Sequence, residues 1–470
     1  MTKSLALHLD RTARVPLGEQ IRQGIAQAID SGVLAPGARL PSWQDLAAQL
    51  GVARGTVRVA YEKLAAAQLI VASRATGTRI AARPMTRALA DRKPDPGSFM
   101  ETYREMTAGP AIFQMGIAGQ DALPAKLLAR IRARAVRDET SAAPLYPDPR
   151  GELDLRREIA TYLAIARGID CSPGQILITG GFSAGLGLAL RVLGLEGRKA
   201  WFEDPGFPFT RHALDLARLS LVPVPVDGDG IDVGDGLRQA PDAALAIVTP
   251  GQQAPLGVTL SLARRLALLD WAAEADAWII EDDYLSELQL KGRAAPALAS
   301  LDREGRVIHI GSFSKTISPA LRLGFIVAPP SLVGHFGEVA ACLAPPPGPA
   351  AQIAIAAFMR DGHYLRHLRR LKRSYAAQRD ALLQQLEPRG RDFTIATAGL
   401  AVSLQLPTAV SDLAIIREML PFGLTPAPLS IWYASPPAAK SGLLLGIATS
   451  PIRHVARSCE RLLSVIDRFI

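Results

Sequence analysis

Short apolar runs alternate with helix-like segments through the middle of this 470-residue chain, and this alternation restricts its fold more than any other feature. Strands that alternate with helices form right-handed crossovers and a largely parallel sheet, whose binding sites lie at the carboxyl ends of the strands. We therefore expect an α/β domain. The expected strands are 175–179, 199–202, 244–248, 277–280 and 306–310, and the expected helices are 186–193, 208–219 and 261–275.

The stretch GSFSKTISPALRLG, residues 311–324, follows the last expected strand. A lysine that condenses with an aldehyde must lose its proton, and burial of Lys315 would favour that loss. The serines before Lys315 and the guanidinium of Arg322 suit a phosphate dianion. Aldehyde and phosphate together indicate pyridoxal 5'-phosphate (PLP). Taken alone, the stretch also fits an ordinary loop with one exposed lysine.

Three other strand ends carry groups that suit the same cofactor. TGGFSA, residues 179–184, joins a strand to a helix N-terminus, whose free N–H groups attract phosphate. EDDY, residues 281–284, offers a carboxylate for a pyridine nitrogen and a phenol for a ring oxygen. EDPGF, residues 203–207, places an aromatic side chain where a flat ring can stack. Acidic loops also bind Mg²⁺ or face solvent, but the order of all three before Lys315 favours PLP.

The N-terminal segment has a different pattern. Apolar residues at helical spacing predict helices near 17–29, 42–50 and 54–64, and the last two are joined by a short turn that contains glycine. This is the helix-turn-helix plan, in which the second helix enters the major groove of DNA. Residues 69–80 predict a hairpin, or wing.

The charge of the chain is unevenly distributed. Residues 1–83 hold eleven Lys or Arg and five Asp or Glu, out of a net charge of +9 for the whole chain. Such a local excess suits a polyanion. A winged helix used only for protein contacts is the alternative. We expect domains at 1–82 and 112–470, joined by a linker at 83–111 that is rich in Pro, Gly and charge.

The cysteines and the N-terminal residues indicate in which cellular compartment the protein is expected. The cysteines at 171, 342 and 459 are widely spaced and fit a reducing cytoplasm. The N-terminus contains no signal-peptide pattern, and no 18-residue apolar run occurs. We expect a soluble cytoplasmic protein.

The N-terminal segment resembles the winged helix-turn-helix of GntR-type transcription regulators through PLGEQI, LPSWQDLAAQLGVARGTVRVAYEKL and GTRI. Two positions depart from the family pattern: Gln44 stands where Arg is common, and Ala53 where Ser is common. Losing such a helix N-cap typically costs about 1 kcal/mol. The resemblance implies DNA contacts from Ser42, Arg54, Gly55, Thr56, Arg58, Arg74, Gly77 and Thr78.

The remainder resembles fold type I aminotransferases, and the whole chain resembles the MocR subfamily of GntR regulators, through YPDPRGELDLR, EDPGF, EDDY and SFSKTISPALRLG. The resemblance implies a mostly parallel sheet with flanking helices, a smaller C-terminal lobe and a homodimer. It implies that Lys315, as the catalytic residue, forms a Schiff base with PLP, that Asp282 pairs with the pyridine nitrogen, that Tyr284 bonds the ring hydroxyl and that Phe207 stacks on the ring. The implied phosphate ligands are Gly181, Phe182, Ser183, Ser312, Ser314 and Arg322, with Tyr146 from the partner subunit.

Three departures concern the substrate. Leu444 stands where these families often have an arginine that pairs with a substrate carboxylate, and Ala401 and Gln252 stand where histidine is usual. An unpaired carboxylate that leaves water costs several kcal/mol, on the order of two decades in affinity. We therefore expect weak or absent transaminase turnover.

The sequence thus predicts a PLP-dependent, DNA-binding transcription regulator that senses a small amine, an amino acid or a vitamin B6 compound. An active aminotransferase with an accessory DNA-binding domain is the alternative. His363 and His367 have a spacing that could hold a metal, but no acidic third ligand is evident, so we expect a solvated basic helix and no metal site.

Overall fold

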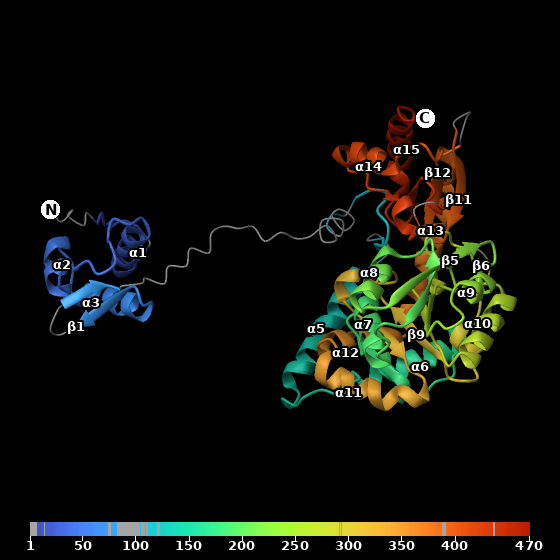
Figure 1. Ribbon diagram of the computed structural model, residues 1–470, viewed down its shortest axis with the longest axis horizontal. Helices are drawn as coiled ribbons and strands as arrows, with labels where there is room; N and C mark the ends of the chain where they lie inside the picture. Colours follow the sequence, from blue (N-terminus) through green and yellow to red (C-terminus); the bar gives the residue numbers. More distant parts are fainter. Residues whose placement is uncertain are drawn as a thin grey trace. The chain divides into compact units, whose positions relative to one another are not determined.

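The computed structural model describes residues 7–13, 15–73, 77–81, 104, 109, 111–119, 123–290, 292, 294–387, 392–435 and 438–470. They fall into two compact units, one within residues 1–98 and one within residues 99–470 (Figure 1). The predicted linker lies almost wholly outside the described residues, so its boundaries stay a prediction.

The described residues of the N-terminal unit form three helices and a hairpin. Their bounds are α1 (Leu17–Asp30), α2 (Trp43–Leu50), α3 (Arg54–Ala66), β1 (Ile70–Ser73) and β2 (Gly77–Ile80). The Ser42 hydroxyl accepts the Asp45 N–H at 3.1 Å, which caps α2. Ala53 precedes α3 and supplies no such bond. The predicted helix-turn-helix and wing are both present.

The larger unit is built on an eight-stranded sheet with the order β3-β10-β9-β8-β7-β4-β5-β6. Pairs among β4, β5, β7, β8 and β9 are parallel, whereas β10 runs antiparallel between β3 and β9. All predicted strands are present, and β5, β6 and β10 are additions to the prediction. The bounds are β3 (Ile176–Thr179), β4 (Lys199–Asp204), β5 (Ser220–Asp227), β6 (Gly230–Ile231), β7 (Leu245–Val248), β8 (Trp278–Asp283), β9 (Val307–Ser312) and β10 (Gly324–Val327).

Helices cover both faces of this sheet (Figure 1). Leu177, Ile308 and Ile310 pack with residues of α7 and α11 on one face. On the other face, α6 covers β3, and Trp271 of α10 stacks on Trp201 of β4 at 3.9 Å between ring centroids. The helices are α5 (Ala125–Ser141), α6 (Leu153–Arg167), α7 (Phe182–Leu193), α8 (Pro208–Leu216), α9 (Val233–Gln239), α10 (Leu262–Glu274), α11 (Val333–Leu343) and α12 (Pro349–Arg360).

A smaller C-terminal lobe completes the unit. Its four-stranded antiparallel sheet has the order β11-β12-β14-β13 and packs with α13, α14 and α15. Residues 111–119 run beside this lobe, where the Gly446 N–H donates to the Phe113 carbonyl at 2.7 Å. No helix in the described ranges is long and apolar enough to cross a membrane. The bounds are β11 (Thr394–Ala398), β12 (Ala401–Gln405), β13 (Ala427–Pro428), β14 (Gly442–Gly446), α13 (His363–Gln385), α14 (Asp412–Met419) and α15 (Ile452–Ile466).

Candidate cofactor site and DNA-binding surface

The antiparallel strand β10 brings two distant strand ends together. Gly324 at its start pairs with Thr179 at the end of β3 and with Ser312 at the end of β9. A Cβ atom at Gly324 would lie 2.8 Å from the Gly311 carbonyl oxygen and 3.0 Å from the Cα of Gly181, so the fit requires glycine. The loops that follow β3 and β9 therefore meet.

An anion cradle lies where these loops meet. Gly181, with φ 89°, begins α7 without a side-chain cap, and a Cβ there would lie 3.9 Å from Arg322 Cζ and 4.0 Å from Ser314 Oγ. The Ser312 hydroxyl donates to Ser314 Oγ at 2.9 Å. Within the described residues, the Arg322 guanidinium has no hydrogen bond or ion pair.

The cradle has the composition that a phosphate requires. The N–H groups of Phe182 and Ser183 stand in the first turn of α7, where they have no intrahelical acceptor. A helix N-terminus, two hydroxyls and a guanidinium together match a dianion. The residues predicted to bind the cofactor phosphate from this chain are thus brought to one place.

Lys315 lies in the loop after β9. Its Nζ donates to the Gly116 carbonyl at 2.6 Å, across 199 residues of sequence. Burial lowers the pKa of Lys315 to about 8, against the opposing charge of Asp282. Gly116 has φ 77°, and a Cβ there would lie 2.9 Å from Nζ, so glycine leaves space for the amine. The sequence reasoning did not identify Gly116, because nothing local marks it.

The helix α13 braces the lysine loop. Tyr364 donates its hydroxyl to Thr316 Oγ1 at 3.3 Å, and His367 places Nε2 2.6 Å from the Thr316 carbonyl oxygen. His367 is 4% exposed, so the expectation that it belongs to a solvated face is wrong. The helix buries this histidine because Thr316 supplies an acceptor for it. His363 instead contacts Arg366 at 2.7 Å.

Asp282 is the middle one of three buried carboxylates at the end of β8. It lies on β8, is 8% exposed, and has no hydrogen bond or ion pair within the described part of the chain. Burial raises its pKa well above the usual value, and the charge of Asp283 raises it further, while Lys315 opposes the rise. A buried charge without a partner is unfavourable. A protonated pyridine nitrogen is the kind of cation that this carboxylate lacks, so the residues present fit PLP.

Tyr284 and Phe207 lie on the apolar side of the candidate cofactor site. Burial raises the pKa of Tyr284. The centroid of the Phe207 ring lies 5.6 Å from that of the Trp432 ring. Both pack against five buried residues, which we call the lobe cluster. The lobe cluster consists of Ala254, Ala427, Leu429, Trp432 and Leu444.

The three positions that depart from the enzyme pattern are buried. Leu444 and Ala401 have no exposed surface, and Gln252 donates to the Leu285 carbonyl at 2.9 Å. Leu444 is therefore sealed by packing inside the lobe cluster. The Tyr146 side chain is fully exposed, and its approach to a partner subunit stays a prediction.

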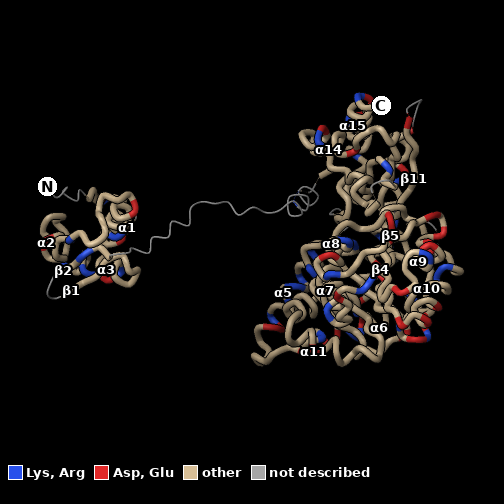
Figure 2. Tube along the Cα trace, in the orientation of Figure 1, with Lys and Arg blue, Asp and Glu red and all other residues tan. Residues whose placement is uncertain are grey.

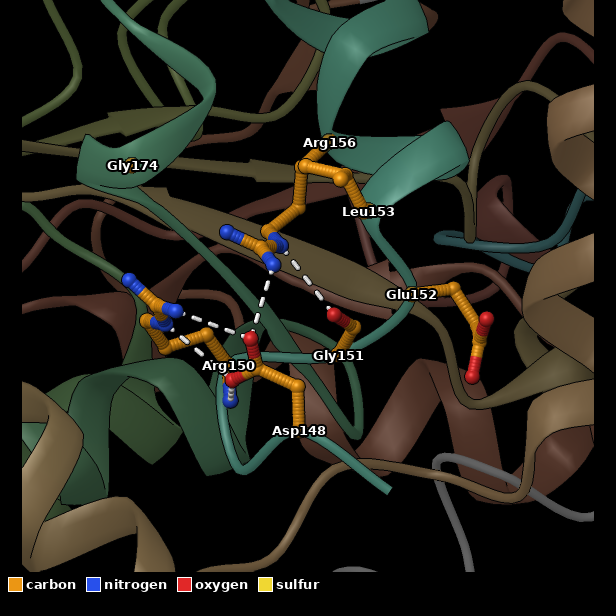
Figure 3. A pocket seen from close by; sticks show the side chains of 7 residues that line it. All are labelled: Asp148, Arg150, Gly151, Glu152, Leu153, Arg156 and Gly174. Atoms are coloured by element: carbon orange, nitrogen blue, oxygen red, sulfur yellow. Dashed lines mark hydrogen bonds and ion pairs between the residues drawn. The ribbon is translucent and has the colours of Figure 1, made fainter.

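Part of the YPDPRGELDLR motif lines a pocket of about 450 Å³ together with Gly174, which lies just before β3, whereas the anion cradle follows the end of that strand. Arg150 and Arg156 both point toward Asp148, at 2.9 and 3.0 Å (Figure 3). Arg156 also donates to the carbonyls of Gly151 and Pro173. Through these bonds, the two arginines fix the loop around Asp148 and the segment that leads into β3.

The predicted DNA-contacting residues lie on the N-terminal unit, whose charges Figure 2 marks. Arg58 is exposed and lies 3.6 Å from Glu62, and Arg74 lies outside the described residues. Of the others, Ser42, Arg54 and Gly55 are exposed, and Thr56, Gly77 and Thr78 are half-buried.

Arg39 is a candidate that the sequence reasoning missed. Its Nε lies 3.3 Å from where a Cβ of Gly77 would stand, and its backbone bridges that of Arg79. In the sequence, only the excess of basic residues in this segment pointed to Arg39. Its contact with the wing joins residues that are far apart in the sequence, so no local pattern reveals it.

Two family models match the chain. The model for bacterial regulatory proteins of the gntR family matches residues 17–80, and the model for aminotransferase class I and II matches residues 118–421. The chain is 25% identical to an archaeal alanine:glyoxylate aminotransferase structure, with a TM-score of 0.72 over 78% of this chain and 93% of that one. A kynurenine aminotransferase structure from Pyrococcus horikoshii, 23% identical, has a TM-score of 0.71 over 80% of this chain and 95% of that one, and shows the same fold.

Curated relatives share both parts. The probable rhizopine catabolism regulatory protein MocR of Rhizobium meliloti is 34% identical over 457 residues, covering 94% of this chain and 92% of the relative. The pyridoxine biosynthesis transcriptional regulator PdxR of Corynebacterium glutamicum is 34% identical over 384 residues, covering 81% of each. The chain therefore belongs to the MocR subfamily of GntR-family transcription regulators, with a helix-turn-helix joined to an aminotransferase class I and II domain.

Proposed function

We propose that this regulator binds PLP through Lys315 and uses it to sense a small molecule. The observation that carries the proposal is the buried carboxylate of Asp282, which no described residue pairs with, in the same region as a lysine of lowered pKa. When bound, PLP supplies an aldehyde that reacts reversibly with amines.

Each residue has a role in this proposal. Asp282 pairs with the ring nitrogen, Tyr284 donates to the ring hydroxyl and Phe207 packs against the ring. The phosphate is held by Ser312, Ser314, Arg322 and the first residues of α7, Gly181, Phe182 and Ser183. Tyr146 comes from a second copy of the chain, which makes the working form a homodimer.

The winged helix binds operator DNA in the cytoplasm, through the residues predicted from the GntR pattern. The effector is a small amine, an amino acid or a vitamin B6 compound. Relatives support this range, since one is named for rhizopine catabolism and another for pyridoxine biosynthesis. An effector shifts DNA binding only if it binds two arrangements of the protein with different affinity. The burial of Leu444 argues against amino-acid turnover.

The experiment begins with DNA that the protein selects from a random-sequence library. Fluorescence anisotropy then measures the affinity of the cofactor-free and PLP-loaded protein for this DNA, followed by a panel of amines and amino acids. We expect PLP loading, or an amine added to the loaded protein, to change the dissociation constant. A change caused by PLP alone identifies a vitamin B6 sensor. An unchanged dissociation constant throughout would contradict the sensing mechanism.

A further inference from the structure

Strand β8 ends in three consecutive buried carboxylates, Glu281, Asp282 and Asp283. Successive side chains of a strand point to opposite faces of the sheet, so Glu281 and Asp283 share one face and Asp282 lies on the other. Ile280 packs with the α7 side of the sheet, and Ile279 with the α10 side. Asp282 thus faces the side of the anion cradle, and the two flanking carboxylates face α6 and α10.

Two buried cations meet the flanking carboxylates. Arg167, the last residue of α6, donates from Nε to Asp283 Oδ2 at 2.7 Å. His309 on β9 places Nδ1 3.0 Å from Glu281 Oε2 and Nε2 3.8 Å from Asp283 Oδ2. Burial lowers the pKa of His309, but the charge of Glu281, the hydrogen bond to Glu281 and the charge of Asp283 raise it overall, which favours the protonated ring. The two flanking carboxylates therefore meet an arginine and a histidine whose charged form they favour.

Asp282 depends on this balance. Like charges within a few ångströms raise the pKa of a carboxyl group, and the effect is strong where water is excluded. If Glu281 and Asp283 carried uncompensated charge, Asp282 would take up a proton and could not pair with a cationic ring nitrogen. Arg167 and His309 offset part of that repulsion from the opposite face of the strand.

We propose that Arg167 and His309 are positioning residues for Asp282: by offsetting the charges of its two neighbours, they help Asp282 to carry the negative charge that meets the cofactor. This inference rests on the proposed binding of PLP. The ion pairs lie on the face of β8 opposite Asp282, so they would act on the cofactor only through this carboxylate. The other titratable or charged groups that face the cluster are Tyr162 of α6, Arg265 of α10, Glu287 of a short 3-10 helix (Ser286–Leu288) and Tyr364 of α13. On the other face, Glu203 of β4 and Lys315 act on Asp282.

The test removes one charge and then restores the balance. Arg167→Met should raise the PLP dissociation constant about tenfold at neutral pH, and should move the acid-side fall in affinity upward by about one pH unit, since one pKa unit corresponds to a tenfold change. The double variant Arg167→Met/Asp283→Asn should recover most of the loss, because it removes both charges of the pair. His309→Gln and His309→Gln/Glu281→Gln repeat the cycle at the second pair, should an Arg167 variant fail to fold.

Arg156 supplies a matched control. It is 3% exposed, like Arg167, and is also paired with a carboxylate, Asp148 at 3.0 Å, but this pair lies outside the cluster. Arg156→Met should lower thermal stability and leave the pH profile of PLP affinity in place. If the Arg167 and His309 single variants keep the wild-type profile, or the double variants recover nothing, the cluster is only structural and the inference fails. If the wild-type protein takes up no PLP, the proposed function fails with it.

Discussion

The two sides of the candidate site differ in the charged groups that they carry. On the cofactor side, Asp282 and Arg322 form no ion pair within the described residues, and the Lys315 amine donates to a backbone carbonyl. On the side of the smaller lobe, Leu444 is buried among the apolar residues of the lobe cluster. Unpaired charges are costly unless a ligand completes them. This comparison supports our proposal that the site is kept for a cofactor and excludes a substrate carboxylate.

The largest expected effect is the loss of PLP affinity when the charge of Asp282 is removed from the cofactor side. Asp282→Asn keeps the shape of the side chain and removes its charge, so PLP affinity should fall about a hundredfold or more, as when one partner of a buried charge pair is truncated. Isothermal titration with PLP measures this. Asp242→Asn is the control, because Asp242 pairs with Lys199 on the exposed surface. Equal affinities in the two variants would remove Asp282 from the site.

The pH dependence of PLP attachment tests the lowered pKa of Lys315 on the same side. With a pKa of about 8, the uncharged fraction of Lys315 increases about fiftyfold between pH 6 and pH 8 and then levels off. The rate of attachment, followed by stopped-flow absorbance, should rise and level off in the same way. A rate that still climbs tenfold per unit above pH 9 would indicate an ordinary, solvated lysine.

The lobe side is tested by adding the missing cation. Leu444→Arg should tighten the binding of L-alanine to the PLP-loaded protein about tenfold, since a charge-assisted hydrogen bond is worth about 1.5–3 kcal/mol. Ethylamine, which lacks the carboxylate, should bind as before. Leu444→Met controls for volume. No gain for L-alanine in a folded Leu444→Arg protein would show that Leu444 is not what excludes the carboxylate.

The last expected effect, similar in size to that of Leu444→Arg, lies on the other unit. Arg58→Ala should weaken binding to the selected DNA about tenfold and flatten its salt dependence, as loss of one phosphate contact does. PLP uptake should stay unchanged, because Arg58 belongs to a separate compact unit. Loss of PLP uptake together with DNA binding would mean that the two functions are not separable.

The sequence predicted those parts of the fold that are determined by residues close together in the chain. The parallel strands and the winged helix follow from apolar spacing and caps such as Ser42. Strand β10 was not predicted, because four apolar residues after a loop do not reveal that they insert antiparallel between β3 and β9.

The same limit applies to the site. Motifs singled out Lys315, Asp282 and Arg322, whereas Gly116 and Arg167 act through contacts across 199 and 116 residues of sequence. His367 was misjudged because its basic neighbours on the helix suggested solvent, while its own ring meets Thr316.

The most direct test of the account is to incubate the protein with PLP, reduce it with borohydride and locate the cofactor by mass spectrometry. The account predicts PLP on the peptide that contains Lys315, and no such product in Lys315→Ala, whose winged helix should still bind the selected DNA. Modification spread over several surface lysines, or none at all, would contradict it.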